Sequence, residues 1–142
     1  MLTRPTAKRF FVLAVPALVV AGVCLVPPAW ARVVVNTINP IVTLSNKGRH
    51  LVVTGPLACD RVQWVDLQVT VTQRDTGAVA EGRVRVLGTP EPRIWTLEAS
   101  AIGDNAFVAG PAQAVALATT TFRGTTDDAR QWLVDVTLRD AN

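Results

Sequence analysis

Residues 64–87 read WVDLQVTVTQRDTGAVAEGRVRVL, and this stretch decides the class of fold. Apolar side chains alternate with polar ones from residue 65 to residue 72, and again from residue 80 to residue 86. Alternation with a period of two over this length indicates half-buried strands. The halves are separated by Asp75-Thr76-Gly77, where glycine can take the positive φ that a tight turn requires. The stretch therefore predicts a β-hairpin.

Similar runs on both sides of this hairpin predict further strands, each bounded by a cluster of turn residues. Gly55-Pro56 is expected to close the strand that precedes the hairpin, and the alanine-rich run after Gly110-Pro111 is assigned to a strand because it contains three consecutive threonines. About seven strands without an amphipathic helix predict an all-β protein, an antiparallel, seven-stranded immunoglobulin-like β-sandwich. Outside the hairpin, the expected strands cover residues 41–44, 49–54, 94–101, 112–122 and 130–139, and residues 33–35 are either a first strand or a weakly paired lead-in.

Residues 1–31 are expected to be a signal peptide, and residues 32–142 are expected to form one β-sandwich domain. Three basic residues precede an apolar run at residues 10–26, and Ala29-Trp30-Ala31 has the small residues that a signal peptidase accepts. Cleavage after Ala31 would leave a secreted or cell-surface protein. The alternative is an uncleaved membrane anchor, because a run of about 17 residues is at the lower limit for crossing a bilayer.

Removal of this segment changes the charge balance. The full chain has 14 Lys+Arg and 11 Asp+Glu. Three of the basic residues and none of the acidic ones precede residue 32, so the domain has 14 − 3 = 11 basic and 11 acidic residues. A net charge near zero predicts that the domain binds neither nucleic acid nor an anionic membrane. The only expected contact with a membrane is an uncleaved signal segment.

Cys59 is the only cysteine of the expected domain, because Cys24 lies in the expected signal peptide. A disulfide within the domain is therefore excluded, and Cys59 is expected to be a free thiol. In an exported protein such a cysteine is buried, bridged to another chain, or reactive. The sequence leaves these three alternatives open.

Short motifs typical of strands and turns run through nearly all of the domain. They are Gly55-Pro56 with Cys59, VTVTQ at residues 69–73, TGAVAEG at residues 76–82, Trp95-Thr96, Phe107 with Gly110-Pro111-Ala112, and Gln131-Trp132. With these motifs the chain resembles a group of uncharacterised small exported bacterial proteins with an immunoglobulin-like β-sandwich domain. The resemblance implies that fold and brings no catalytic or binding residue. Members of the group often carry further cysteines near the positions held here by Leu87 and Leu133, so no disulfide is carried over.

The sequence gives little support for catalysis. His50 is the only histidine, and neither serine of the domain, Ser45 or Ser100, lies in a nucleophile-elbow pattern. Cys59 with His50 is the one pair that would supply a nucleophile and a base. The competing interpretation is a surface histidine and a thiol at the edge of the core. We therefore expect no enzymatic activity, no catalytic residue and no cofactor.

Four residues of expected loops are candidate ligands of a metal ion. Asp104, Asn105, Asp127 and Asp128 offer the oxygen atoms that calcium prefers. Their spacing matches no known ligand motif, and no set of cysteines and histidines suits zinc. No metal site is expected.

Tryptophans are the better candidates for binding. Trp95 and Trp132 alternate in phase with apolar neighbours, which predicts that they lie in the core. Trp64 alternates in phase with Asp66 and Gln68, so it is expected on the polar face of its strand. An exposed tryptophan on a sheet stacks on sugars or anchors protein partners, and the alternative is that it caps the core. We expect a non-catalytic binding or structural module at or outside the cell surface, with Trp64 as its contact residue; the alternative is a carbohydrate-binding or enzyme-accessory module.

Overall fold

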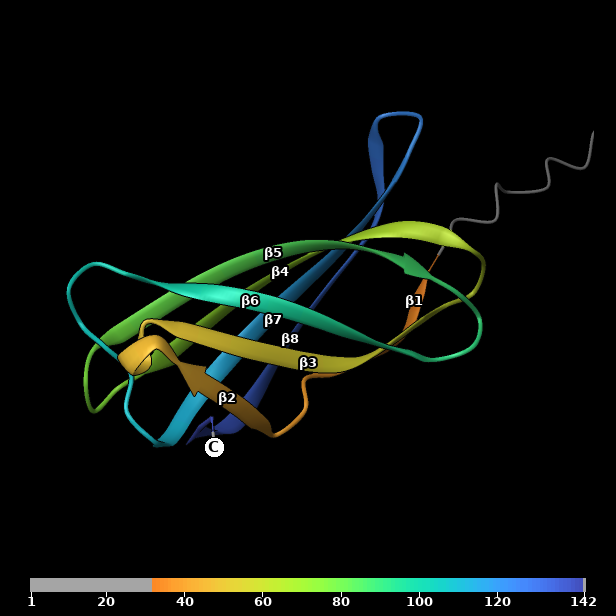
Figure 1. Cartoon of the computed structure of the whole chain (residues 1–142). Helices are drawn as coiled ribbons and strands as arrows, with labels where there is room; N and C mark the ends of the chain where they lie inside the picture. Colours follow the sequence, from red (N-terminus) through yellow and green to blue (C-terminus); the bar gives the residue numbers. More distant parts are fainter. Residues whose placement is uncertain (1–31, 142) are drawn as a thin grey trace, which may run out of the picture.

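The computed structural model describes residues 32–141 as a chain of eight strands with one short 3-10 turn (Figure 1). The predicted signal peptide lies outside the described residues. In chain order the elements are β1 (Val33–Asn36), β2 (Ile41–Ser45), η1 (Asn46–Gly48), β3 (His50–Cys59), β4 (Gln63–Gln73), β5 (Ala78–Gly88), β6 (Arg93–Ile102), β7 (Gly110–Phe122) and β8 (Thr125–Asp140).

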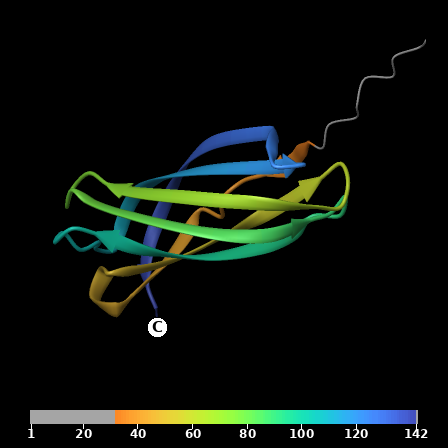
Figure 2. The ribbon, with the colours of Figure 1, turned by 90° about the horizontal axis from the view of Figure 1, so that it is seen from above.

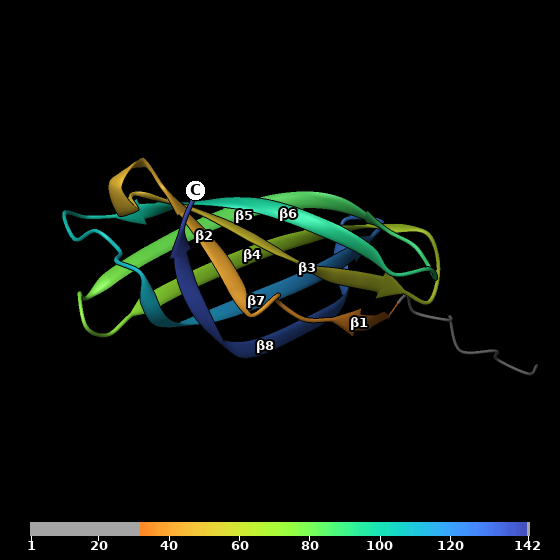
Figure 3. The same cartoon turned by 60° about the horizontal axis from the view of Figure 1, so that its bottom comes forward.

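The strands form one sheet that closes on itself. The order of neighbours is β3-β2-β8-β7-β4-β5-β6, and β6 pairs again with β3 from His50↔Ser100 to Leu57↔Arg93. Among the described strands β1 pairs only with β3, beyond the part of β3 that pairs with β2. All neighbours are antiparallel except β2 and β8, which run parallel from Ile41↔Thr137 to Leu44↔Asp140. The fold is therefore a seven-stranded mixed β-barrel (Figure 1, Figure 3).

The predicted immunoglobulin-like sandwich is wrong, whereas the all-β class is confirmed. Alternation within a strand determines which side chains share a face, but it does not determine which strand lies alongside. A sandwich has two separate sheets with free edges. Here the β3–β6 and β2–β8 pairings join those edges, so each of the seven barrel strands has a neighbour on both sides, and β1 alone among the described strands has one partner.

The hairpin at residues 64–87 is confirmed as β4 and β5, which pair from Gln63↔Gly88 to Gln73↔Ala78. The expected end of a strand at Gly55-Pro56 is wrong, because β3 continues through both residues to Cys59. Gly55 lies inside the barrel, where an added Cβ would meet the ring of Trp95. Opposite Pro56 the chain has left β1 and has not yet entered β2. The missing N–H of proline therefore breaks no hydrogen bond of a strand pairing on that side.

Alternate side chains of the strands fill the interior of the barrel. Along β7 the inward positions are four alanines, at residues 112, 114, 116 and 118, followed by Thr120. These small side chains leave room for larger ones from other strands, among them Trp95 and the half-buried Trp132. The core residues all lie between Val33 and Leu138, so the chain from Arg32 onward contains the complete described fold.

The barrel has two distinct ends. At one end β3, β5 and β7 finish and β1, β4, β6 and β8 begin; at the other lie η1, the β4–β5 turn, the β6–β7 loop and the last residues of β8. The two groups lie to the right and to the left in Figure 1, and the view in Figure 2 separates them in the same way. We call the first the N-terminal end, because the fold begins there at Arg32. Within residues 32–141, no helix has the length and apolar character needed to cross a membrane.

Candidate functional site

Trp64 lies on the outer surface of the barrel near the start of β4 and is 53% exposed. Its cross-strand neighbour is Leu87 of β5, and the guanidinium of Arg85 lies 5.5 Å from the centroid of the Trp64 ring. That distance is within the range of cation–π attraction. The structure places Trp64 on the polar face, together with Asp66 and Gln68, as its phase in the sequence predicts. Its role in binding stays a prediction.

A shallow groove lies beside Trp64 on the outer surface of β4, β5 and β7. Arg85 links the Trp64 ring to this groove. Its guanidinium lies over the ring, and its Nε lies 3.7 Å from Oδ1 of Asp66, which lines the groove. Both partners of this ion pair are more than half exposed, so the pair adds little stability and its groups stay accessible to a ligand. The groove encloses about 390 Å³ and is lined by Asp66, Leu67, Gln68, Arg83, Val84, Arg85, Leu117 and Thr119. We call Trp64 and this groove the Trp64 face.

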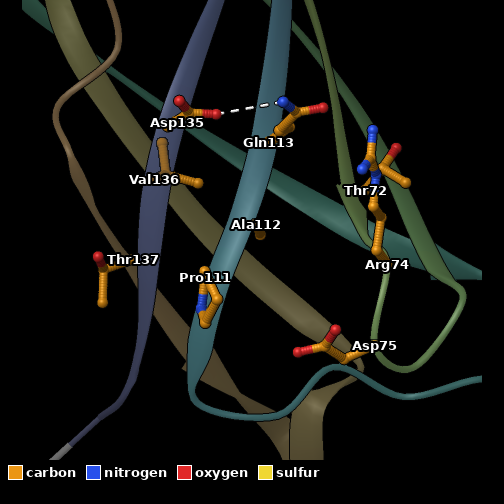
Figure 4. A pocket seen from close by; sticks show the side chains of 9 residues that line it. All are labelled: Thr72, Arg74, Asp75, Pro111, Ala112, Gln113, Asp135, Val136 and Thr137. Carbon is orange, nitrogen blue, oxygen red and sulfur yellow. Dashed lines mark hydrogen bonds between the residues drawn. The ribbon is translucent and has the colours of Figure 1, made fainter.

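A second groove of about 480 Å³ lies toward the opposite end, over β4, β7 and β8 (Figure 4). Gln113 Nε2 donates a hydrogen bond to Asp135 Oδ1 at 3.2 Å, so these two polar groups satisfy each other. Arg74 and Asp75 stand apart from that pair in Figure 4. The lining includes two threonines and no histidine or cysteine that would activate them. The lining of this groove therefore offers no pair of a nucleophile and a histidine base.

The structure separates Cys59 from His50, which are the last and first residues of β3. At about 3.3 Å per residue they lie about 30 Å apart, so they cannot act together as nucleophile and base. His50 instead contacts Ser100 across the β3–β6 pairing, with 3.3 Å between His50 Nδ1 and Ser100 Oγ. Among residues 32–141 no carboxylate is hydrogen-bonded to the His50 ring, so the group that orients the base in a catalytic triad is missing. Strand alternation could not predict this contact, because it depends on how the barrel closes.

Cys59 is a buried free thiol in the structure. Burial raises the pKa of Cys59 above its ordinary value of 9.0, the side chain of Gln63 lowers the pKa, and the charges of Asp60 and Asp128 raise it. Gly88 leaves space for the sulfur, since an added Cβ there would collide with Cys59 Sγ. A thiol that stays protonated at neutral pH is a poor nucleophile.

The four loop residues weighed as calcium ligands do not meet. Asp104 and Asn105 lie in the β6–β7 loop, whereas Asp127 and Asp128 lie near the start of β8 at the N-terminal end. Within residues 32–141 no group of three or more histidine, cysteine or acidic side chains is placed to hold a metal ion.

Asp127 and Asp128 bind groups of the protein itself. Asp127 accepts a hydrogen bond from Thr120 Oγ1, and its Oδ2 lies 3.8 Å from Arg61. Asp128 accepts a hydrogen bond from the backbone nitrogen of Val33 at 2.9 Å and lies 3.4 Å from Arg130. The adjacent carboxylates therefore point to different partners and fasten β1 and the β3–β4 loop to β8.

Comparison with known proteins identifies no relative, since no family model matches this chain and no curated protein matches it. The resemblance to small exported bacterial proteins stays a prediction, and the barrel replaces the fold that it implied.

Proposed function

We propose that this protein is an exported, non-catalytic binding module and that the Trp64 face is its contact surface. The observation that carries the proposal is the exposed Trp64 ring beside a groove lined by charged and amide side chains. An indole on a regular strand loses little conformational entropy on binding, because only two χ angles become fixed. Polar groups beside an apolar platform supply orientation and specificity. The arrangement suits recognition of a partner.

Export is supported by the sequence of residues 1–31, with its basic start, apolar run and Ala29-Trp30-Ala31. Intact-mass measurement of protein recovered outside the cell is expected to give a chain that starts at Arg32. Recovery of the chain in the membrane pellet with Met1 retained would contradict cleavage and favour the anchor.

The absence of catalysis is supported by the distance between Cys59 and His50 and by the missing carboxylate at the His50–Ser100 contact. We expect no turnover of generic ester, peptide or glycoside substrates. Turnover that is abolished in His50→Ala would overturn this part of the proposal.

A carbohydrate-binding module is the alternative form of the same proposal. It is favoured by the open groove lined by Asp66 and Gln68, which Arg85 links to the Trp64 ring, because sugars need an aromatic platform and hydrogen-bonding groups. Glycan arrays and pull-downs from cell-envelope extracts separate sugar from protein partners.

The decisive variant in both assays is Trp64→Ala, and its matched control is Ile102→Ala. Ile102 is 54% exposed, as Trp64 is, but lies at the opposite end of the barrel. Removal of an anchoring tryptophan is expected to weaken binding by about 2 kcal/mol or more, whereas the control should bind as the wild type does. Equal binding by all three proteins would remove the Trp64 face as the contact surface.

A further inference from the structure

Exposed apolar side chains gather at the N-terminal end of the barrel. Ten large hydrophobic residues are exposed in the described chain, and six of them lie in the loops and strand ends there. Single exposed hydrophobic residues are normal on a protein surface, whereas a gathering of this kind marks an interaction site. These six, which we call the apolar rim, are Val34, Val62, Trp64, Leu87, Ile94 and Phe122.

The β7–β8 hairpin carries part of the apolar rim away from the body of the barrel (Figure 1). Its turn consists of Arg123 at φ 51° and Gly124 at φ 81°, enclosed by the pair Phe122↔Thr125. Two successive positive φ values make the tight turn that fits the twist of a hairpin, so the tip is a defined structure. Phe122 is 56% exposed there, and the guanidinium of Arg123 lies 5.2 Å from its ring centroid.

Trp64 and Arg85 repeat this combination of an exposed ring and an arginine. Within residues 32–141 these are the two cation–π pairs, and both lie at the N-terminal end. At the boundary of a lipid bilayer an aromatic ring lies at the level of the headgroups, and a guanidinium binds phosphate oxygens. Two such pairs at one end of a barrel therefore match the chemistry of a membrane surface.

The accessible charge at this end is positive, although the domain as a whole is neutral. Asp127 and Asp128 have side chains only 12% and 14% exposed and are bound to protein donors. Within the described residues, Arg93 and Arg123 take part in no ion pair and are exposed, and the same is true of Asp60 and Glu91. The excess of positive charge arises because six arginines of this end are exposed, against three carboxylates, those of Asp60, Asp66 and Glu91. The arginines at this end are Arg32, Arg61, Arg85, Arg93, Arg123 and Arg130, against Asp60, Asp66, Glu91, Asp127 and Asp128. An anionic surface complements this arrangement.

The part of the chain outside the structure joins the fold at the same end. Only five residues separate the apolar run at residues 10–26 from Arg32, and five residues reach at most about 17 Å. Before cleavage after Ala31, or in the alternative of an uncleaved anchor, that run enters the bilayer, and the N-terminal end of the barrel is then the part of the fold closest to the lipid.

We infer that the N-terminal end of the barrel docks on the surface of a bilayer that contains anionic lipid. Trp64, Ile94 and Phe122 enter the headgroup level, and the arginines beside them bind lipid phosphates. The inference rests on the proposed function, because it names the partner of a surface that includes Trp64. Each arginine that reaches the lipid is expected to strengthen binding about fivefold, which corresponds to about 1 kcal/mol.

The test uses the chain from Arg32 to Asn142, which contains the complete described fold and lacks the apolar run. Its sedimentation is measured with vesicles of phosphatidylcholine alone and with vesicles in which part of this lipid is replaced by phosphatidylglycerol. We expect binding to the anionic vesicles only, weakened at about 0.5 M salt because charges are screened there. Tryptophan emission should shift to shorter wavelength on binding, and the shift should be absent in Trp64→Phe.

Substitutions at the two ends of the barrel serve as matched pairs. Phe122→Ala and Arg123→Glu are expected to weaken binding to anionic vesicles by about tenfold each, through lost apolar burial and reversed charge. Ile102→Ala and Arg139→Glu make the same kinds of change at the opposite end and should leave binding within about twofold. Thermal unfolding of every variant shows whether it retains the fold.

Absence of binding to both kinds of vesicle, or equal weakening by the variants at the two ends, would overturn the inference. If a glycan or protein partner still binds and requires Trp64, the proposed function stands and only the identity of the partner is wrong. If Trp64→Ala affects no ligand of any kind, the proposed function fails as well.

Discussion

At the scale of single residues, the surroundings of each tryptophan ring determine the effect of removing it. Trp95 is 3% exposed inside the barrel, so Trp95→Ala should lower the free energy of unfolding by about 3–5 kcal/mol. Trp64→Ala should change it by less than about 0.5 kcal/mol, because its ring contacts mainly Arg85 and solvent. The half-buried Trp132 should give an intermediate value. Denaturant unfolding followed by circular dichroism measures all three, and equal destabilisation would show that Trp64 belongs to the core.

Because of Cys59, the free energy of unfolding is expected to depend on pH in the alkaline range. Burial raises the pKa of this thiol in the folded chain, so the unfolded chain loses its proton at a lower pH than the folded chain does. The contribution of the thiol to stability is therefore complete below the ordinary pKa of 9.0 and is lost as pH rises through the folded pKa. Urea unfolding between about pH 7 and about pH 10.5 should show this decrease in the wild type but not in Cys59→Ala. Parallel pH profiles for the two proteins would contradict the burial argument.

Because Cys59 is a free thiol, the stability of the fold should not depend on redox conditions. With Cys59 buried and free, a reducing agent is expected to leave the melting temperature unchanged, and Cys59→Ser should cost at most about 1–2 kcal/mol. Size-exclusion chromatography with and without reductant is the complementary measurement. A dimer that dissociates on reduction would show an intermolecular bridge.

At the scale of elements, Gly82 lies where β5 passes close to the backbone of β6. An added Cβ would collide with the backbone oxygen of Glu98 and would lie 3.0 Å from the Cα of Ala99. Because backbone atoms cannot move aside cheaply, Gly82→Ala should destabilise the barrel by about 2–3 kcal/mol. Gly103→Ala is the control, since nothing lies near its Cβ position and only the φ of +73° opposes it, at a cost of about 1 kcal/mol. A harmless Gly82→Ala would mean that β5 and β6 separate easily.

Strand alternation predicts elements well and their neighbours poorly. It located β4, β5, the turn between them and the outward position of Trp64, because these depend on local sequence alone. It predicts an end of β3 at Gly55-Pro56, because glycine and proline usually mark turns. Here glycine makes room for the ring of Trp95, and proline stands where no strand pairs with β3 on one side. It could not find the His50–Ser100 contact or the apolar rim, because both depend on which loops and strands meet after the barrel closes.

At the scale of the whole molecule, a sum of charges conceals how the charges are arranged. The eleven basic and eleven acidic residues of the domain led to the expectation that it does not bind an anionic membrane. The structure shows carboxylates bound to protein donors at the N-terminal end, while Arg93 and Arg123 point outward. Net charge therefore bears on solubility, whereas binding depends on which charges remain accessible.

The start of the domain supplies a prediction that links export to stability. The backbone nitrogen of Arg32 donates a hydrogen bond to Asp60 Oδ1 at 2.9 Å, and the Asp60 nitrogen donates one to the Arg32 oxygen at 3.0 Å. With the proposed cleavage after Ala31, the Arg32 nitrogen becomes a charged ammonium, which strengthens its bond to the carboxylate. Asp60→Asn should then lower the stability of the cleaved chain by about 0.5–1 kcal/mol.

The comparison protein for this prediction carries two extra alanines before Arg32, so that the nitrogen remains an uncharged amide. Asp60→Asn should have a clearly smaller effect there, as measured by urea unfolding of the four proteins. An equal loss in both chain forms would show that the ammonium adds nothing.

The parallel pairing of β2 with β8 has a consequence for how this chain is made. The second strand of the domain needs residues 137–140 as its neighbour, and those residues emerge from a ribosome only after every other strand of the barrel. Until then β2 has only β3 beside it, and the barrel stays open along one seam. Pairings between such distant parts of a chain form slowly. If the chain is exported through a narrow channel from its N-terminal side, as proposed, the barrel can therefore close only after residues 137–140 have passed through.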